Sequence, residues 1–313
     1  MRILVVGAGG IGGYFGGRLL EGGCDVTFLV RPRRAAQLGA AGLVLRSPKG
    51  DYHHPRPPTV HAATLRGPFD LVLLSCKAYD LDDAIRSFAP AVGPDTSILP
   101  LLNGMRHLDV LERQFGPAAV LGGQCVISVA LDGQGTISHL NDSHLLSFGA
   151  RDTSRSARMR AIEATFARAR FESRLTDQIL QEMWEKWVFL ATLAGITCLM
   201  RTTVGDIVAA GGAELATALL AECTAIAADS GFRPSEASRA RSLRTLTASG
   251  STITASMLRD VERGGPTEVE HVLGDLMRRR TPPNDLPSIL RIAYLHVGAY
   301  EKRRQRTAYP PSS

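Results

Sequence analysis

The sequence predicts an α/β domain with a doubly wound, mostly parallel sheet, followed by an all-α domain. In the first half, short apolar runs such as residues 2–6 and 69–75 alternate with helical patterns such as 11–21 and 81–89. Strands that are apolar throughout are typical of a parallel sheet covered by helices on both faces. From about residue 177 to about residue 300 we find no strand pattern, only successive helical ones.

The chain has 313 residues, a length that favours two domains. We place the boundary where the pattern changes, giving domains of residues 1–176 and 177–313. The strands expected in the first domain are 2–6, 25–30, 42–46, 69–75, 97–102, 118–129, 135–139 and 145–148. Residues 51–68 contain several prolines and are expected to form a loop. The helices expected in the second domain are 178–200, 204–230, 234–247, 252–263, 268–280 and 286–303.

Composition argues against several classes of partner. The net charge is +6, but the basic residues are dispersed and form no stripe with interleaved aromatic residues, so we expect no nucleic acid partner. No apolar stretch reaches about 18 residues, which predicts no membrane span. Met1 leads directly into the first predicted strand, so we expect no signal peptide. The positive charge suits an anionic cofactor and an anionic substrate.

The cysteines and histidines indicate neither disulfides nor a metal site. The five cysteines are widely spaced, form no CxxC pair and lie mostly in or beside apolar runs. This pattern predicts buried, reduced thiols in a cytoplasmic protein. The eight histidines show no metal-ligand spacing, so we expect no metal.

The glycine cluster after the first strand is the clearest motif. Gly7, Ala8, Gly9, Gly10, Ile11 and Gly12 form a GxGxxG pattern between a predicted strand and a predicted helix. In that context the pattern indicates a dinucleotide-binding Rossmann domain. Gly7 permits the tight turn, Gly9 lets the backbone approach a pyrophosphate, and Gly12 lets helix and strand pack closely. The helix N-terminus then binds the phosphates. The alternative is a glycine-rich turn without a ligand.

The residue after the second strand indicates the cofactor. NAD enzymes usually carry an acidic residue there to bind the ribose hydroxyls, but this chain has Arg31. A guanidinium matches a 2′-phosphate well, so we expect NADP(H), with Arg31 as the main contact and Arg34 as a candidate second one. The alternative is a solvated basic turn.

Two lysines and an asparagine are candidate site residues. The chain contains only four lysines, and two of them, Lys77 and Lys186, lie in apolar surroundings. Each is interpreted either as a general acid or substrate clamp, or as a side chain that reaches water from the end of a helix or strand. Lys77 and Asn103 each follow a predicted parallel strand, where ligands bind. For Asn103 the alternative is a simple Asn-Gly turn.

Taken in order along the chain, these motifs resemble the ketopantoate reductase family (2-dehydropantoate 2-reductase). The resemblance rests on GxGxxG, Arg31, the segments 76–79 and 103–105, and three further segments: 184–186, 256–260 and 267–270. It implies NADPH-dependent reduction of 2-dehydropantoate, a small anionic 2-oxo acid, to pantoate in pantothenate and coenzyme A biosynthesis. It also implies an active site between the two domains, and a homodimer is compatible with the long, apolar helical domain.

The resemblance also implies residue roles. The catalytic residues would be Lys186, which would donate the proton to the ketone oxygen, and Glu268. Glu268 and Ser256 would hold the substrate, and Lys77 and Asn103 would contact cofactor and substrate. Without the resemblance, Ser256 and Glu268 would be interpreted as ordinary polar helix surface.

One departure concerns the helix that carries Lys186. The family typically has asparagines four and eight residues after this lysine, whereas this chain has Leu190 and Ala194. All three positions share one helix side, so two hydrogen-bonding groups for the substrate are missing. We therefore keep a second hypothesis, a reductase for another, more apolar 2-oxo acid or ketone. A third is a non-catalytic NADP(H)-binding regulator, which would not need a lysine proton donor.

Overall fold

A computed structural model describes residues 1–152, 156–281 and 288–308. The chain divides into two compact units. The N-terminal unit comprises Met1–Leu102 and His107–Leu180, and the helical unit comprises Asn103–Arg106 and Gln181–Ser313. The boundary at residues 180 and 181 lies four residues beyond the one expected from the sequence. The predicted fold class, an α/β Rossmann domain followed by an all-α domain, is confirmed.

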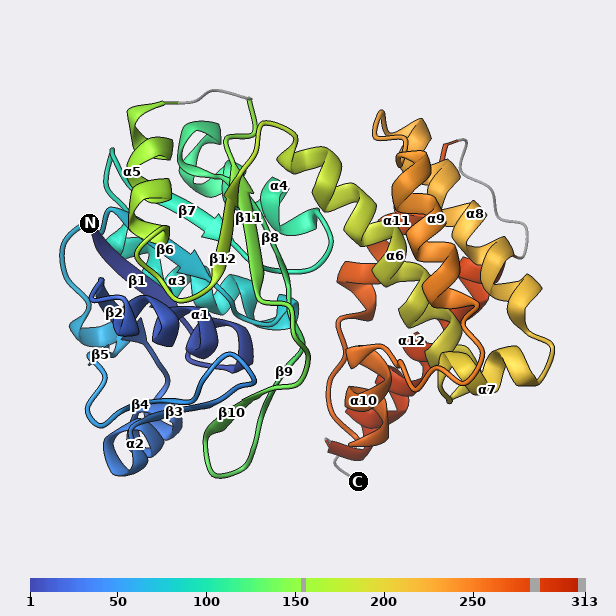
Figure 1. Ribbon diagram of the computed structural model, residues 1–313, viewed down its shortest axis with the longest axis horizontal. Helices are drawn as coiled ribbons and strands as arrows, with labels where there is room; N and C mark the ends of the chain where they lie inside the picture. Colours follow the sequence, from blue (N-terminus) through green and yellow to red (C-terminus); the bar gives the residue numbers. More distant parts are fainter. Residues whose placement is uncertain (153–155, 282–287, 309–313) are drawn as a thin grey trace. The chain divides into compact units, whose positions relative to one another are not determined.

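The N-terminal unit is built on a five-stranded parallel sheet (Figure 1). In spatial order its strands are β5 (Thr59–Val60), β2 (Asp25–Leu29), β1 (Arg2–Val6), β6 (Leu71–Leu74) and β7 (Ser97–Pro100). The chain builds the sheet outward from β1 in one direction and then returns to add β6 and β7 on the other side. Strand order therefore reverses between β1 and β6. Open α/β sheets bind ligands at such a switch point, outside the carboxyl ends of the strands.

Helices and short 3-10 turns connect these strands. The α-helices are α1 (Gly10–Glu21), α2 (Pro32–Ala41), α3 (Leu81–Phe88), α4 (Arg106–Phe115) and α5 (Ala157–Phe166). The 3-10 turns are η1 (Ala62–Thr64), η2 (Ala78–Asp80), η3 (Ala89–Ala91) and η4 (Pro117–Ala119). The strands β1 and β6 are buried almost throughout, as expected for a parallel sheet with covered faces.

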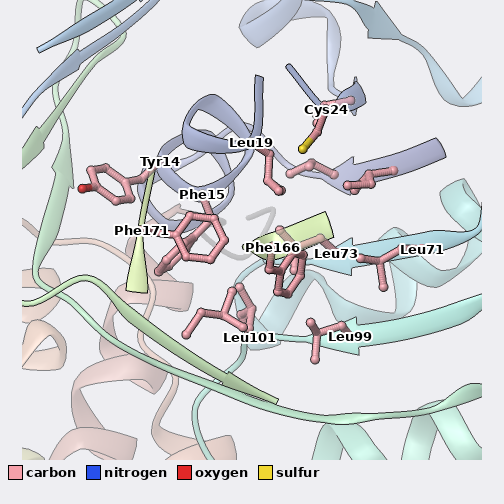
Figure 2. Close-up of a cluster of buried hydrophobic side chains, with 14 of the residues drawn as sticks. Tyr14, Phe15, Leu19, Cys24, Leu71, Leu73, Leu99, Leu101, Phe166 and Phe171 are labelled. Carbon is pink, nitrogen blue, oxygen red and sulfur yellow. The ribbon is translucent and has the colours of Figure 1, made fainter. Parts of the chain in front are cut away.

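The core of this unit holds α1 in place. Figure 2 shows Phe15 and Leu19 of α1 among Phe166, Phe171 and leucines of the sheet. The rings of Phe15 and Phe171 meet edge to face with centroids 5.0 Å apart. Edge-to-face contacts of this kind add to the stabilisation from apolar burial. The helix that follows the glycine motif is therefore fixed by buried aromatic packing.

Two smaller sheets complete the N-terminal unit. One contains β4 (Tyr52–His54), β3 (Leu43–Arg46), β10 (Thr136–His139) and β9 (Val129–Leu131); the other contains β12 (Glu172–Leu175), β11 (Leu145–Gly149) and β8 (Gly122–Val126). The expected loop 51–68 was partly wrong, because β4 pairs antiparallel with β3 and β5 extends the main sheet. The expected strand 118–129 divides into β8 and β9, which join different sheets.

The described part of the helical unit contains no strand. Its helices are α6 (Ile179–Met200, whose first two residues belong to the N-terminal unit), α7 (Val204–Ala209), α8 (Ala213–Asp229), α9 (Glu236–Leu246) and α10 (Ser256–Glu262). They are followed by a π-helical turn η5 (Glu270–Gly274), α11 (Asp275–Arg278) and α12 (Ile289–Ala308). The single helix expected over 204–230 is broken at Gly211, whose φ of +87° ends α7. Residues 286 and 287 of the expected last helix lie outside the described residues.

The long helix α6 is a core helix. By length and hydropathy it is the one helix among the described residues that qualifies as a candidate membrane span, but 67% of its most apolar window is buried inside the protein.

Cys198 on α6 and Cys223 on α8 are buried, and burial raises the pKa of each thiol to about 12. None of the five cysteines is joined in a disulfide; four of them are buried, as expected, and Cys76 is partly exposed.

Candidate active site

The glycine loop has the geometry that a dinucleotide requires. Gly7 follows β1 with a φ of +91°, a backbone conformation that favours glycine. Gly9 is the N-cap of α1 and supplies no side chain to cap the first N–H groups of the helix. A Cβ atom placed on Gly9 would meet no atom within 4 Å, so the backbone there is open to a ligand. The residues fit the pyrophosphate of NAD(P), which would lie against the positive end of the α1 dipole.

Gly12 and Ser75 hold this loop against the sheet. A Cβ atom on Gly12 would overlap both the Ser75 hydroxyl and the Gly7 carbonyl oxygen. The Ser75 hydroxyl donates to the carbonyls of Val6 and Gly7, at 3.0 and 3.2 Å. Ser75 was not among the residues predicted from the sequence. The available signal was a hydroxyl at the end of the apolar strand β6, because such a group needs a hydrogen-bond partner when it is buried.

Arg34 also braces the glycine loop. Its Nε donates to the Ala8 carbonyl at 2.8 Å, and its Nη1 donates to the Gly135 carbonyl at 3.1 Å and to the Gln37 side chain at 3.3 Å. Burial lowers the pKa of this guanidinium. Its Nη2 is buried with no hydrogen-bond partner among the described residues. A contact of Arg34 with a 2′-phosphate stays a prediction.

Arg31 lies two residues beyond β2, at the same sheet edge as the glycine loop. Its side chain is 64% exposed and forms ion pairs with Asp80 and Asp83, each at 2.9 Å. Hydrogen bonds to these carboxylates, first Asp80 and then Asp83, raise the pKa of Arg31. The position expected for a 2′-phosphate contact is thus occupied by an arginine with two acidic partners, neither of which was predicted from the sequence.

Lys77 and Asn103 follow the next two strands of the sheet. Lys77 lies three residues after β6 and precedes η2, and it is half-buried. Since β6 pairs with β1, Lys77 and the glycine loop flank the switch point of the sheet. Asn103 comes three residues after β7 and belongs to the helical unit, followed by Gly104 in a left-handed turn with a φ of +79°.

In the helical unit, buried aromatic side chains fix the part of α6 that carries Lys186. Lys186 is half-buried, while its neighbours Trp184 and Trp187 are 2% and 1% exposed. The Trp184 ring stacks on Phe232 with centroids 5.4 Å apart, and the Arg279 guanidinium lies within 5.7 Å of both indole rings. A lysine on such a rigidly packed helix is presented in a defined direction.

Trp187 links the helix of Lys186 to the segment that begins with Glu268. The indole N–H of Trp187 donates to the Val272 carbonyl in η5, at 2.9 Å. The backbone N–H groups of His271 and Val272 both donate to the Glu268 carbonyl, at 3.0 and 2.9 Å. Single π-helical turns within helices often occur at functional sites. The segments carrying two candidate residues, Lys186 and Glu268, are therefore joined by one buried hydrogen bond, that of Trp187.

The third candidate residue of this unit, Ser256, is the exposed first residue of α10. The preceding backbone N–H, that of Ala255, donates to the Thr197 hydroxyl of α6 at 3.4 Å. Leu190 is half-buried and Ala194 is 4% exposed, and both lie on α6 between Lys186 and Thr197. Neither side chain offers a hydrogen bond to a substrate. No group of three or more potential metal ligands occurs among the described residues.

We expect Trp187→Phe to lower kcat about tenfold and to destabilise the helical unit by about 1–3 kcal/mol, because the buried Val272 carbonyl loses its donor. Affinity for the dinucleotide should not change. The matched control is Trp184→Phe, since Trp184 is equally buried and its indole makes no hydrogen bond among the described residues. Steady-state kinetics and thermal unfolding check this. Equal loss in both variants would contradict a special role for the Trp187 bond.

A second prediction concerns pH. Burial, opposed in part by Asp275 and reinforced by Arg106, Arg278 and Arg279, lowers the pKa of His271 from 6.5 to about 4. Between these values the unfolded state binds the extra proton, so stability falls as pH falls below about 6.5. The loss should approach about 3 kcal/mol near pH 4.

The two tryptophans of the chain, Trp184 and Trp187, both lie in the helical unit, so their fluorescence reports its unfolding in urea. Between pH 7 and pH 5 the wild-type protein should lose more stability than His271→Gln, which cannot titrate at this position. Identical pH dependence in the two proteins would show that His271 is not the group responsible.

Comparisons with known proteins identify the family of the chain. The family profile "Ketopantoate reductase PanE/ApbA" matches residues 3–153, and "Ketopantoate reductase PanE/ApbA C terminal" matches residues 178–280. A Bacillus subtilis (strain 168) protein described as "Uncharacterized oxidoreductase YkpB" is 38% identical over 97% of this chain and 100% of its own length.

Solved structures extend the similarity to the fold. A 2-dehydropantoate 2-reductase from Geobacter metallireducens GS-15 superposes with a TM-score of 0.86 and 26% identity, covering 96% of this chain and 99% of its own. D-mandelate dehydrogenase in a ternary structure with NADH and anilino(oxo)acetate has a TM-score of 0.86 at 18% identity, covering 97% and 100% of the two chains, and shares the fold. The chain is an oxidoreductase that belongs to the ketopantoate reductase family.

Proposed function

We propose that this protein reduces the ketone of a 2-oxo acid with NADPH, and that 2-dehydropantoate, reduced to pantoate in pantothenate and coenzyme A biosynthesis, is its substrate. The observation that carries the proposal is Lys186, a half-buried lysine on a helix fixed by two buried tryptophans. The family to which the chain belongs and the open glycine loop support it. A non-catalytic regulator would need the glycine loop but not this lysine.

The residues divide the work between the two units. In the N-terminal unit, the glycine loop and α1 would hold the pyrophosphate of the dinucleotide, and Arg31 the 2′-phosphate. When bound, NADPH supplies the hydride that adds to the carbonyl carbon. Lys77 and Asn103 would contact dinucleotide and substrate, each from a position just beyond a strand of the sheet.

The helical unit would supply the proton. Hydride addition places negative charge on the ketone oxygen. The Lys186 ammonium would neutralise this charge by donating its proton to that oxygen. The resulting lysine amine would then take up a proton from water. Glu268 and Ser256 would hold the hydroxyl and carboxylate region of the substrate. The hydrogen bonds from His271 and Val272 to the Glu268 carbonyl keep the backbone of that residue in place.

The apolar side chains of Leu190 and Ala194 favour a second candidate, a 2-oxo acid with an apolar side chain. A site without amide groups at these positions gains nothing from a substrate hydroxyl and accepts an apolar substituent more readily. D-mandelate dehydrogenase has the same fold, which supports this second candidate.

A panel of 2-oxo acids distinguishes the two candidates. Initial rates of NADPH oxidation are measured with 2-dehydropantoate, phenylglyoxylate, pyruvate and 2-oxoisovalerate, with NADH in place of NADPH as the cofactor control. The proposal requires the highest kcat/KM with 2-dehydropantoate. A higher value with phenylglyoxylate or 2-oxoisovalerate would transfer the assignment to the apolar candidate, and absence of turnover with every acid would support the regulator.

We also propose that the protein acts in the cytoplasm as a homodimer, with no nucleic acid or membrane partner. Cysteines that form no disulfide fit a reducing compartment. On α12, Ile292 and Leu295 are 47% and 54% exposed, which makes this helix the candidate surface for a second copy. Light scattering of wild-type protein and of Leu295→Glu tests the dimer.

A further inference from the structure

The acidic partners of Arg31 occupy the hydrogen-bonding edges through which it would bind a phosphate. Its Nη2 donates to Asp80 Oδ1 and to Asp83 Oδ2, both at 2.9 Å, and its Nη1 lies 3.5 Å from Asp80 Oδ2. Nη2 carries two hydrogens, and these two bonds use both of them. The three residues come from the end of β2 and from η2 and α3, all in the N-terminal unit.

A guanidinium binds phosphate best through two parallel N–H groups on one edge. Those edges are formed either by Nη1 with Nη2 or by Nε with Nη2. Both include Nη2, the atom that Asp80 and Asp83 share in this protein. A 2′-phosphate therefore has to displace at least one carboxylate before Arg31 can bind it in a paired fashion.

When a phosphate displaces Asp83 from Arg31, Arg86 remains as an ion-pair partner for the Asp83 carboxylate. The Arg86 guanidinium, one turn further along α3, already lies 3.2 Å from the other oxygen of the Asp83 carboxylate. Asp83 can thus leave Arg31 and keep an ion pair. Together, the charges of Arg31, Arg86, Asp80 and Asp83 sum to zero, so this group as a whole does not attract a doubly charged phosphate.

The same carboxylates suit a cofactor that lacks the phosphate. The ribose hydroxyls of NADH are hydrogen-bond donors, and enzymes that use NAD place a carboxylate at this edge of the sheet to accept from them. Here the acidic groups come from η2 and α3 instead of β2, but their hydrogen bonds to Arg31 bring them to that edge. The carboxylates of Asp80 and Asp83 therefore weaken binding of the 2′-phosphate of NADPH and favour binding of the unphosphorylated ribose of NADH.

We propose that Asp80 and Asp83 set the cofactor preference of this protein by competing with the 2′-phosphate for Arg31. The protein then accepts both NADPH and NADH, with a preference for NADPH smaller than Arg31 alone would give. This inference rests on the proposed role of Arg31 as the 2′-phosphate contact.

The test is calorimetric titration of the full-length protein with NADP⁺ and with NAD⁺. Asp83→Asn and Asp80→Asn should each tighten NADP⁺ binding about fivefold, because the phosphate then gains about the binding free energy of one charge-assisted hydrogen bond to Arg31. NAD⁺ binding should stay equal or become weaker. The matched control is Asp82→Asn, which removes the same charge from the same turn of α3 but forms no bond to Arg31 among the described residues. It should change either affinity less than about twofold.

Two results would overturn the proposal. If Asp80→Asn and Asp83→Asn weaken NADP⁺ binding, the carboxylates position Arg31 and do not compete for it. If both variants behave like Asp82→Asn, only the general charge of α3 matters. Arg31→Ala separates this inference from the proposed function, because unchanged NADP⁺ affinity in that variant would mean that Arg31 does not bind the 2′-phosphate at all.

Discussion

Lys186→Ala is expected to lower kcat for reduction of the 2-oxo acid about a thousandfold. The alkoxide that forms on the ketone oxygen would lose both its proton donor and the positive charge that stabilises it. The affinity for NADPH should remain within about twofold of the wild-type value, since the glycine loop lies in the N-terminal unit and Lys186 in the helical unit. Steady-state kinetics and a fluorescence titration with NADPH measure the two quantities separately.

Two further substitutions make this experiment specific. Lys302→Ala removes an exposed lysine of α12 in the same unit and should leave kcat unchanged. Lys186→Arg keeps a positive charge but cannot readily give up a proton, so it should restore substrate binding without restoring kcat. Wild-type turnover in Lys186→Ala would exclude this lysine as the proton donor.

Gly12→Ala is expected to disrupt the N-terminal unit even before any cofactor binds. The added methyl group would overlap the Ser75 hydroxyl and the Gly7 carbonyl, so either α1 moves away from the sheet or the glycine loop changes its turn. Overpacking of this kind costs about 1–3 kcal/mol, and NADPH affinity should fall at least about tenfold because the loop loses its geometry. Thermal unfolding and NADPH titration measure these effects.

Gly9→Ala is the matched comparison. Its added methyl group meets no atom of the protein within 4 Å, and its φ of −77° suits alanine, so the stability of the free protein should be unchanged. NADPH affinity should nevertheless fall, because the methyl group stands where the pyrophosphate approaches the backbone. If Gly9→Ala bound NADPH as tightly as the wild-type protein, the phosphates would not lie against this part of the loop.

The features that were predictable from sequence are those encoded locally. The strand–glycine–helix motif occupies residues 2–21, and its consequence, a turn at Gly7 and an open N-terminus of α1, depends on neighbours in the chain. The absence of strand patterns beyond about residue 177 likewise revealed the helical unit. Buried apolar strands needed only their own composition to be recognised.

The features that were missed depend on contacts between distant residues. Arg31 meets Asp80 and Asp83 across 49 and 52 positions of the chain, and Trp187 meets Val272 across 85. Neither contact leaves a periodic signal. The strand β12 is a further example, since its Glu-Ser-Arg-Leu sequence is polar and only its pairing with β11 makes it a strand.

The most direct test of the account is the fate of the transferred hydride. NADPH carrying deuterium at the reactive position of its nicotinamide ring is incubated with the protein and 2-dehydropantoate, and the product is examined by mass spectrometry and NMR. We expect pantoate with deuterium on the hydroxyl-bearing carbon, and only trace product when Lys186→Ala replaces the wild-type protein. Product without deuterium, or deuterated product formed equally well by Lys186→Ala, would contradict it.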